Sequence, residues 1–113
     1  MTNKYYKERR EKQIETEIKQ YIKDHGGLCY KIHGGDLYQE TGIPDLLVCW
    51  KGLFFGIEVK DPQGKPSVMQ LAQGVRIKKA GGHFIIAKSV QDVIDYTKEK
   101  GLIDYEKKSD LEI

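Results

Sequence analysis

The chain is 113 residues long, with 39% hydrophobic residues, 32% charged residues and a formal net charge of +2. This length suits one compact domain, and the mixture of apolar and charged residues can bury a core, which excludes disorder throughout. The small charge neither indicates nor excludes a nucleic-acid partner, and no apolar run approaches the ~18 residues that a membrane-spanning helix needs.

The first half of the chain predicts one helix followed by three strands. Apolar residues at three-and-four spacing predict a helix over Tyr5–His25, which a glycine pair ends. A short apolar run predicts a strand over Leu28–Ile32, and a polar stretch, His33–Ile43, follows it. Two further apolar runs, Leu46–Trp50 and Leu53–Lys60, are separated by only two residues and therefore predict a hairpin.

The second half predicts helix, strand and helix. Ser67 and Gln70 have the spacing of a capping box, which predicts a helix that runs to Ala80. A fourth strand is expected over His83–Lys88, and Ser89 is placed to cap a third helix that Gly101 closes. The order α-β-β-β-α-β-α predicts an α/β fold with a mixed central sheet flanked by helices.

We expect a single domain over residues 1–113, with its core at about 11–100 and a charged tail at 101–113 that is loosely ordered or makes an accessory contact. The polar N-terminus lacks the apolar segment of a signal peptide, so a cytoplasmic location is expected. Cys29 and Cys49 lack the spacing of a zinc site and are expected to be buried strand residues in a reducing compartment.

The predicted hairpin places the first candidate catalytic residues. If Lys51 and Gly52 form a two-residue turn, continuing the pairing places Asp45 directly opposite Glu58. The two-residue alternation of a strand then places Lys60 on the same face as Glu58. A bulge at Gly52 would shift the pairing with Asp45 by one residue and leave the relation of Glu58 to Lys60 unchanged.

Two carboxylates that share a sheet face repel each other, and they form a good site for a hard cation such as Mg²⁺. Such an ion polarises a phosphodiester oxygen and lowers the pKa of an attacking water, while Lys60 could orient that water or stabilise developing negative charge. Phosphodiester hydrolysis is the natural reaction. The alternative is that Asp45 caps a turn after Pro44, and that Glu58 and Lys60 are ordinary solvent-facing strand residues. We favour the site, because three such residues would otherwise have to meet on one face by chance. Glu58 and Lys60 are expected to lie at this site and not in the core.

These residues belong to a longer pattern: Gly42-Ile43-Pro44-Asp45, then Ile57-Glu58-Val59-Lys60, then Ser67-Val68-Met69-Gln70. The pattern resembles the virus-type replication-repair nuclease (VRR-Nuc) family of the PD-(D/E)xK nuclease superfamily, over roughly Glu11 to Tyr96. The resemblance implies a restriction-endonuclease-like αβββαβ core and a Mg²⁺- or Mn²⁺-dependent endonuclease that acts on branched or structured DNA. Small stand-alone members of phage type resemble Holliday-junction resolvases that work as homodimers.

The resemblance also implies further residues of the site. The metal ligands would be Asp45, Glu58, the backbone carbonyl of Val59 and a glutamate of the first helix. Glu11 and Glu15 are four residues apart on one helix face, and either one could be that glutamate. Analogy with the family favours Glu11, whereas the distance from the helix end favours Glu15; a solvated charged face is the alternative for each. Gln70 would touch the substrate or a water at the metal, or would only complete the capping box.

DNA contacts are expected around this site. The DNA-binding candidates are Lys31, His33, Lys65, Ser67 and Arg76. The basic residues among them could neutralise phosphates, although a charge run is usually a solvated face. His33 could act as a proton shuttle, which a lone histidine seldom does. The loop from His33 to Gly42 has three glycines and could close over DNA, or it could be an idle surface loop.

The partner is therefore expected to be DNA, with a second copy of the chain. Modest support for a homodimer comes from Leu53, Phe54 and Phe55, an apolar surplus that a small core does not fully cover. A flap or repair nuclease would use the same residues on other DNA. A DNA-binding module without chemistry is the remaining alternative, which the presence of Asp45, Glu58 and Lys60 disfavours.

Overall fold

The computed structural model describes residues 4–33 and 40–105 of the chain. In chain order its elements are helix α1 (Lys4–Asp24), strands β1 (Leu28–Lys31), β2 (Leu46–Trp50) and β3 (Leu53–Val59), helix α2 (Val68–Lys79), strand β4 (His83–Ala87) and helix α3 (Val90–Glu99). This order confirms the expected α-β-β-β-α-β-α, with bounds that differ from the predicted ones by one or two residues.

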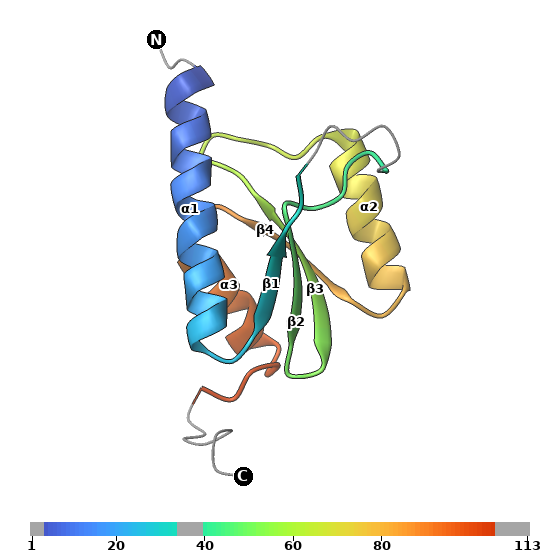
Figure 1. The fold of residues 1–113 in the computed structure, drawn as a ribbon. Coiled ribbons are helices and arrows are strands. Elements are labelled where there is room, and N and C mark those ends of the chain that lie inside the picture. The colour runs from blue at the N-terminus through green and yellow to red at the C-terminus, as the bar shows by residue number, and fades with distance from the viewer. Residues whose placement is uncertain (1–3, 34–39, 106–113) are drawn as a thin grey trace.

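The four strands form one mixed sheet in the order β1-β2-β3-β4. Strand β2 is antiparallel to both β1 and β3, whereas β3 and β4 are parallel. Helices α1 and α3 cover one face of the sheet, and α2 lies on the other face against β3 and β4 (Figure 1). None of the helices in residues 4–33 and 40–105 is long and apolar enough to cross a membrane.

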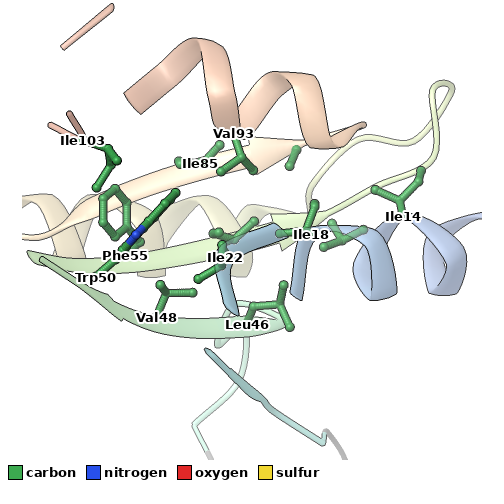
Figure 2. Close-up of a cluster of buried hydrophobic side chains, with 13 residues drawn as sticks. Ile14, Ile18, Ile22, Leu46, Val48, Trp50, Phe55, Ile85, Val93 and Ile103 are labelled. Atoms are coloured by element: carbon green, nitrogen blue, oxygen red, sulfur yellow. The ribbon is translucent and has the colours of Figure 1, made fainter. Parts of the chain in front are cut away.

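The main core lies between the sheet and the α1–α3 layer. Ile14, Ile18 and Ile22 of α1 belong to one buried cluster with Leu46 and Val48 of β2 (Figure 2). Their spacing of four residues places all three on one face of the helix, as the sequence predicted. Because burying one such side chain stabilises a fold by about 1.5–3 kcal/mol, this stripe is what holds α1 on the sheet.

The hairpin turn fixes the pairing of β2 with β3. Lys51 and Gly52 both have positive φ, 53° and 78°, as a two-residue type I′ turn requires. The ladder then runs without a bulge from Trp50 opposite Leu53 to Leu46 opposite Ile57. The predicted register is confirmed over these residues, and Asp45 and Glu58 occupy the next position along it.

The segment after α3 packs more closely than expected. Ile103 is buried in the main core, and Leu102 and Tyr105 pack against the core's edge. The Tyr105 hydroxyl and the Thr97 hydroxyl are hydrogen-bonded at 2.6 Å. The prediction of a loosely ordered tail is therefore wrong for residues 102–105, which make the accessory contact instead; residues 106–113 lie outside the described residues.

The two cysteines are in strands, as expected, and both are free thiols, but the prediction that both are buried is wrong. Cys49 is exposed and Cys29 is partly buried. The reason lies in the layer structure. Because α2 covers only β3 and β4 on its face, Cys49 and its cross-strand neighbours Leu28 and Phe54 are left open to solvent.

Candidate active site

Two carboxylates meet where β2 begins and β3 ends. Asp45 lies directly before β2, and its Oδ2 accepts a hydrogen bond of 2.8 Å from the backbone N–H of Val59. The side chain of Asp45 is 30% exposed, whereas that of Glu58 is 1% exposed. One acid of the pair therefore faces solvent and the other is enclosed by protein.

Lys60 and Gln70 both approach the buried carboxylate. The Nζ of Lys60 lies 3.4 Å from Oε2 of Glu58, and Nε2 of Gln70 donates to the same oxygen at 2.8 Å. The backbone N–H of Lys60 donates to the carbonyl of Ala87 on β4, which fixes this end of β3 in the sheet. The predicted meeting of the lysine with Glu58 is thus observed.

Gln70 fills two roles that the sequence set against each other. Its Oε1 accepts from the backbone N–H of Ser67 at 2.7 Å, and its own N–H donates to the Ser67 hydroxyl at 3.1 Å. These two bonds complete the capping box of α2. Because an amide side chain has separate acceptor and donor atoms, the Nε2 remains available for Glu58. The helix cap and the contact with the carboxylate therefore coexist.

The surroundings of Glu58 favour its protonated form. The pKa of the Glu58 carboxyl is raised to about 8, chiefly by burial and also by the nearby Asp45, while the ammonium of Lys60 opposes the shift. Within the described residues, Oε1 of Glu58 is buried without a hydrogen-bond partner. The sequence alternative of a solvent-facing Glu58, and the expectation that it lies outside the core, are both wrong because α2 covers β3 here.

Glu11 and Glu15 both face the exposed side of this site. Glu15 Oε1 lies 2.7 Å from Nζ of Lys31, which is also 3.8 Å from Oδ1 of Asp45. Glu11 Oε2 accepts from the backbone N–H of Asp61 at 3.2 Å. Burial alone would lower the pKa of Lys31, but its bond to Glu15 and the surrounding carboxylates raise it. Lys31 is therefore a charged bridge from α1 to Asp45.

A pocket of about 560 Å³ opens between α1 and this end of the sheet. Its lining includes Glu11, Glu15, Lys31, His33, Asp45 and Val59. Both candidate helix glutamates are thus close enough to line one space with Asp45. The geometry does not choose between them, since each is engaged by a different neighbour.

The donor set fits a hard divalent cation. Among residues 4–33 and 40–105, no three His, Cys, Asp or Glu side chains are close enough together to hold a metal ion. Mg²⁺, however, usually takes only one or two protein carboxylates and keeps several waters. Asp45 and Glu58 supply such a pair, and the partnerless Oε1 of Glu58 is the kind of buried oxygen that a cation satisfies.

Arg76 lies away from this cluster. Its Nη1 is 3.0 Å from Oε2 of Glu40, and it lines a separate depression beside the hairpin turn. Lys65 and Ser67 belong to the loop that leads from β3 into α2, on the same side as Glu58. The part of the expected DNA-closing loop at residues 34–39 lies outside the described residues.

Gly42 lies three residues before Asp45 and packs closely against α2. Its φ is +83°, and a Cβ there would meet the backbone carbonyl carbon and oxygen of Met69 at 2.6 and 2.5 Å. Only glycine fits such a close approach in that conformation. The first turn of α2 thus lies directly against the segment that leads to Asp45.

Sequence reasoning missed Asp61 and Gln73 as supports of the site. Asp61 is buried, and its Oδ1 accepts from the N–H of Gln63, an Asx turn that the Asp-Pro-Gln-Gly sequence could have indicated. Gln73 is also buried and donates to Glu40 and to the carbonyl of Thr41. No local pattern marks Gln73, because its partners lie more than thirty residues away.

The fold and this arrangement were compared with known proteins. No family model matches the sequence, and no curated protein matches it. A solved structure described as a VRR_NUC domain matches with a TM-score of 0.65 and 28% identity, over 80% of this chain and 95% of that one. The match supports the restriction-endonuclease-like fold that the sequence resemblance implied. The match therefore supports a VRR-Nuc domain, which is a nuclease domain of the PD-(D/E)xK type.

Proposed function

We propose that this VRR-Nuc domain is a metal-dependent, structure-selective DNA endonuclease that hydrolyses phosphodiester bonds, with Asp45, Glu58 and Lys60 at its active site. One observation carries the proposal. A fully buried carboxylate, Glu58, lies 3.4 Å from a lysine and beside a second carboxylate at a sheet end that opens into a pocket. Burying an ionisable carboxyl is costly for stability whether it is charged or protonated, so a function is the better account of its presence.

In this proposal the carboxylates of Asp45 and Glu58 hold Mg²⁺ or Mn²⁺, with the Val59 carbonyl as a further ligand. When bound, the ion supplies positive charge that polarises a phosphodiester oxygen and lowers the pKa of a water. To serve as a ligand, Glu58 would have to lose the proton that it otherwise keeps at neutral pH. Glu11 or Glu15 would complete the site from α1, and both line the same pocket.

Lys60 and Gln70 have separate tasks. The side chain of Lys60 is 16% exposed, so it is partly open to solvent while its ammonium remains close to Glu58. There it orients the attacking water and offsets negative charge that develops on the phosphate. Gln70 holds Oε2 of Glu58 through a hydrogen bond, which fixes the orientation of that carboxylate relative to the pocket.

The DNA contacts are proposed for residues that line the pocket or the loop beside it. Lys31 and His33 line the pocket, and Lys65 and Ser67 lie where the 61–66 loop meets α2. Arg76 would contact DNA only at a distance from the scissile bond, because its ion pair with Glu40 lies toward the other end of α2. A cytoplasmic location remains a prediction.

The preferred substrate is proposed to be a Holliday junction cut by a homodimer, because two symmetric cuts require two related sites. Of the three apolar residues first suggested for the dimer, Phe55 is buried and Leu53 packs on the core, so only Phe54 remains available. Better support comes from α2, where Val68, Leu71 and Val75 are exposed at helical spacing. Sedimentation should give a dimer, and Leu71→Glu should give a monomer if α2 forms the interface.

The deciding experiment is cleavage of a labelled four-way junction beside matched flap and duplex DNA, with Mg²⁺, with Mn²⁺ and with EDTA. Paired nicks in the junction alone, only with metal, would support a resolvase. Metal-dependent cutting of flaps would favour the repair-nuclease alternative that uses the same residues. Binding of DNA without any cutting would contradict the catalytic proposal and leave a DNA-binding module.

A further inference from the structure

A second depression adjoins the pocket at the candidate active site. It has a volume of about 510 Å³ and lies between α1 and β1, with Lys23 and Cys29 in its lining. Thr16 and Lys19 line both depressions, so the two adjoin each other along α1. We call the whole channel the α1–β1 groove; it is bounded by Lys12, Thr16, Lys19 and Lys23 on α1 and by Gly27 and Cys29 across from them.

The groove changes its charge along its length. Its inner end, at Asp45, carries Glu8, Glu11 and Glu15, whereas no acidic residue lines the outer depression in the part of the chain that the structure describes. Burial raises the pKa of the Cys29 thiol to about 11, so that group is neutral near pH 7. The outer groove is therefore positive, and its positive charge comes from α1.

Three lysines on one face of α1 supply this charge. Lys12, Thr16, Lys19 and Lys23 follow a four-three-four spacing, which places them in one row along the helix. Within residues 4–33 and 40–105, Lys12, Lys19 and Lys23 form no ion pair, unlike Lys31, which is bound to Glu15. Their ammonium groups are thus available for an external anion.

The length of the row fits a DNA strand. Lys12 and Lys23 are eleven residues apart, which is about 16 Å along a helix axis. One strand of DNA carries a phosphate for about every 3.4 Å of its axis, so the row spans about five phosphates. On the other side of the groove, β1 is the edge strand of the sheet, and no further strand pairs with its outer side among residues 4–33 and 40–105. Backbone N–H groups are common phosphate ligands.

We propose that the α1–β1 groove binds the phosphodiester backbone of one DNA arm as it leaves the candidate active site, with Lys19 and Lys23 contacting its phosphates. This inference rests on the proposed endonuclease function and adds to it a path for the substrate. Because phosphate contacts carry no base information, this part of the binding is independent of sequence. The acidic inner end holds the metal site, and the basic outer end holds the arm.

The test measures binding of labelled DNA in EDTA, where no cutting occurs, at several salt concentrations between 50 and 200 mM. The variant replaces both lysines, Lys19→Gln with Lys23→Gln. Its matched control is Lys98→Gln with Lys100→Gln, which removes the same charge from α3, where each lysine lies over a tyrosine ring outside the groove. Duplex and single-stranded DNA are both used.

Each lost phosphate contact should reduce the steepness of the negative slope of log affinity against log salt by about 0.9 for duplex or about 0.7 for a single strand. The groove variant should therefore lose about 1.8 or about 1.4, and its affinity deficit on duplex should shrink about twelvefold from 50 to 200 mM salt. The control should keep the parent slope. An unchanged slope in the groove variant, or an equal loss in the control, would overturn the proposal.

A gain-of-charge variant protects the test against misfolding. Thr16→Lys adds a cation at the exposed position that both depressions share, and should increase the steepness of the negative duplex slope by about 0.9. No change in slope would count against the groove. Cleavage by the parent with Mn²⁺ is scored separately. If the parent cuts no DNA, the endonuclease proposal fails, while the salt comparison still decides whether the groove binds the backbone.

Discussion

The two ends of the β2–β3 hairpin are built from one continuous ladder and yet differ in chemistry. At the turn, Trp50 and Phe55 are buried with their rings 6.0 Å apart, and the indole N–H donates to the carbonyl of His25. At the open end the ladder leads to Asp45 and to a buried Glu58 that keeps one oxygen without a partner. The turn end stabilises the fold, whereas burying the Glu58 carboxyl at the open end lowers the free energy of unfolding.

The largest effect is expected for Lys60→Ala at the carboxylate end. Removing a cation that stabilises developing charge should lower cleavage about 100-fold or more, while the melting temperature stays near that of the parent. Steady-state cleavage assays on the preferred DNA measure the rate, and thermal melts measure the melting temperature. Lys78→Ala, an exposed position late on α2, is the control. Parent-like cutting by Lys60→Ala would remove Lys60 from the site.

The turn end should respond in the opposite way. Trp50→Ala leaves a cavity and an unpaired His25 carbonyl, so the free energy of unfolding should fall by about 3–5 kcal/mol. Urea denaturation measures this loss. At low temperature, where the variant is still folded, its cleavage rate should stay close to the parent's. Unchanged stability of this variant would contradict the role of the turn end in stabilising the fold. A folded but inactive variant would contradict the independence of the two ends.

A pH titration sharpens the contrast at Glu58. In metal-free protein the folded state keeps a proton that the unfolded state loses, so stability should fall as the pH rises from about 4.5 to about 8. Glu58→Gln removes this contribution. The variant should therefore be more stable than the parent at pH 8, and the difference should shrink toward pH 5. Thermal melts in EDTA measure it, and a difference that does not depend on pH would contradict the raised pKa.

The smallest effect separates the two roles of Gln70. Ser67→Ala removes the N-cap acceptor of α2 and should cost about 1 kcal/mol of stability, with little change in cleavage, because the bond from Gln70 to Glu58 remains. Gln70→Ala should lose both stability and activity. Measuring melting and cleavage in the two variants tests this split, which fails if Ser67→Ala reduces cleavage as much as Gln70→Ala.

Local chemistry predicted the hairpin well. Lys51 and Gly52 lie between two apolar runs, and the two-residue turn then sets every later pair of the β2–β3 ladder. The capping residues Ser67 and Ser89 likewise marked the starts of α2 and α3. These features depend on neighbours in sequence, which is why the sequence alone specifies them.

Features that depend on layer packing were not predictable. Alternation along β3 says which residues share a face with Glu58, but not that α2 covers that face, so the burial of Glu58 was missed. Helical spacing placed Glu11 and Glu15 on one face, while their different partners, Asp61 and Lys31, follow from how α1 lies on the sheet. The packing of Ile103 into the core has the same origin.

The most direct test of the central claim measures the binding of Mn²⁺ to the protein by titration calorimetry. The titration is done at pH 7 in two buffers that differ in their heat of ionisation. Parent protein should bind Mn²⁺ and release protons, since Glu58 must lose its own for the ion to bind. Asp45→Asn keeps an oxygen for the Val59 N–H and should still fold, but should bind Mn²⁺ far more weakly. Equal Mn²⁺ affinity in parent and Asp45→Asn, with no proton release, would contradict a metal site built on Asp45 and Glu58.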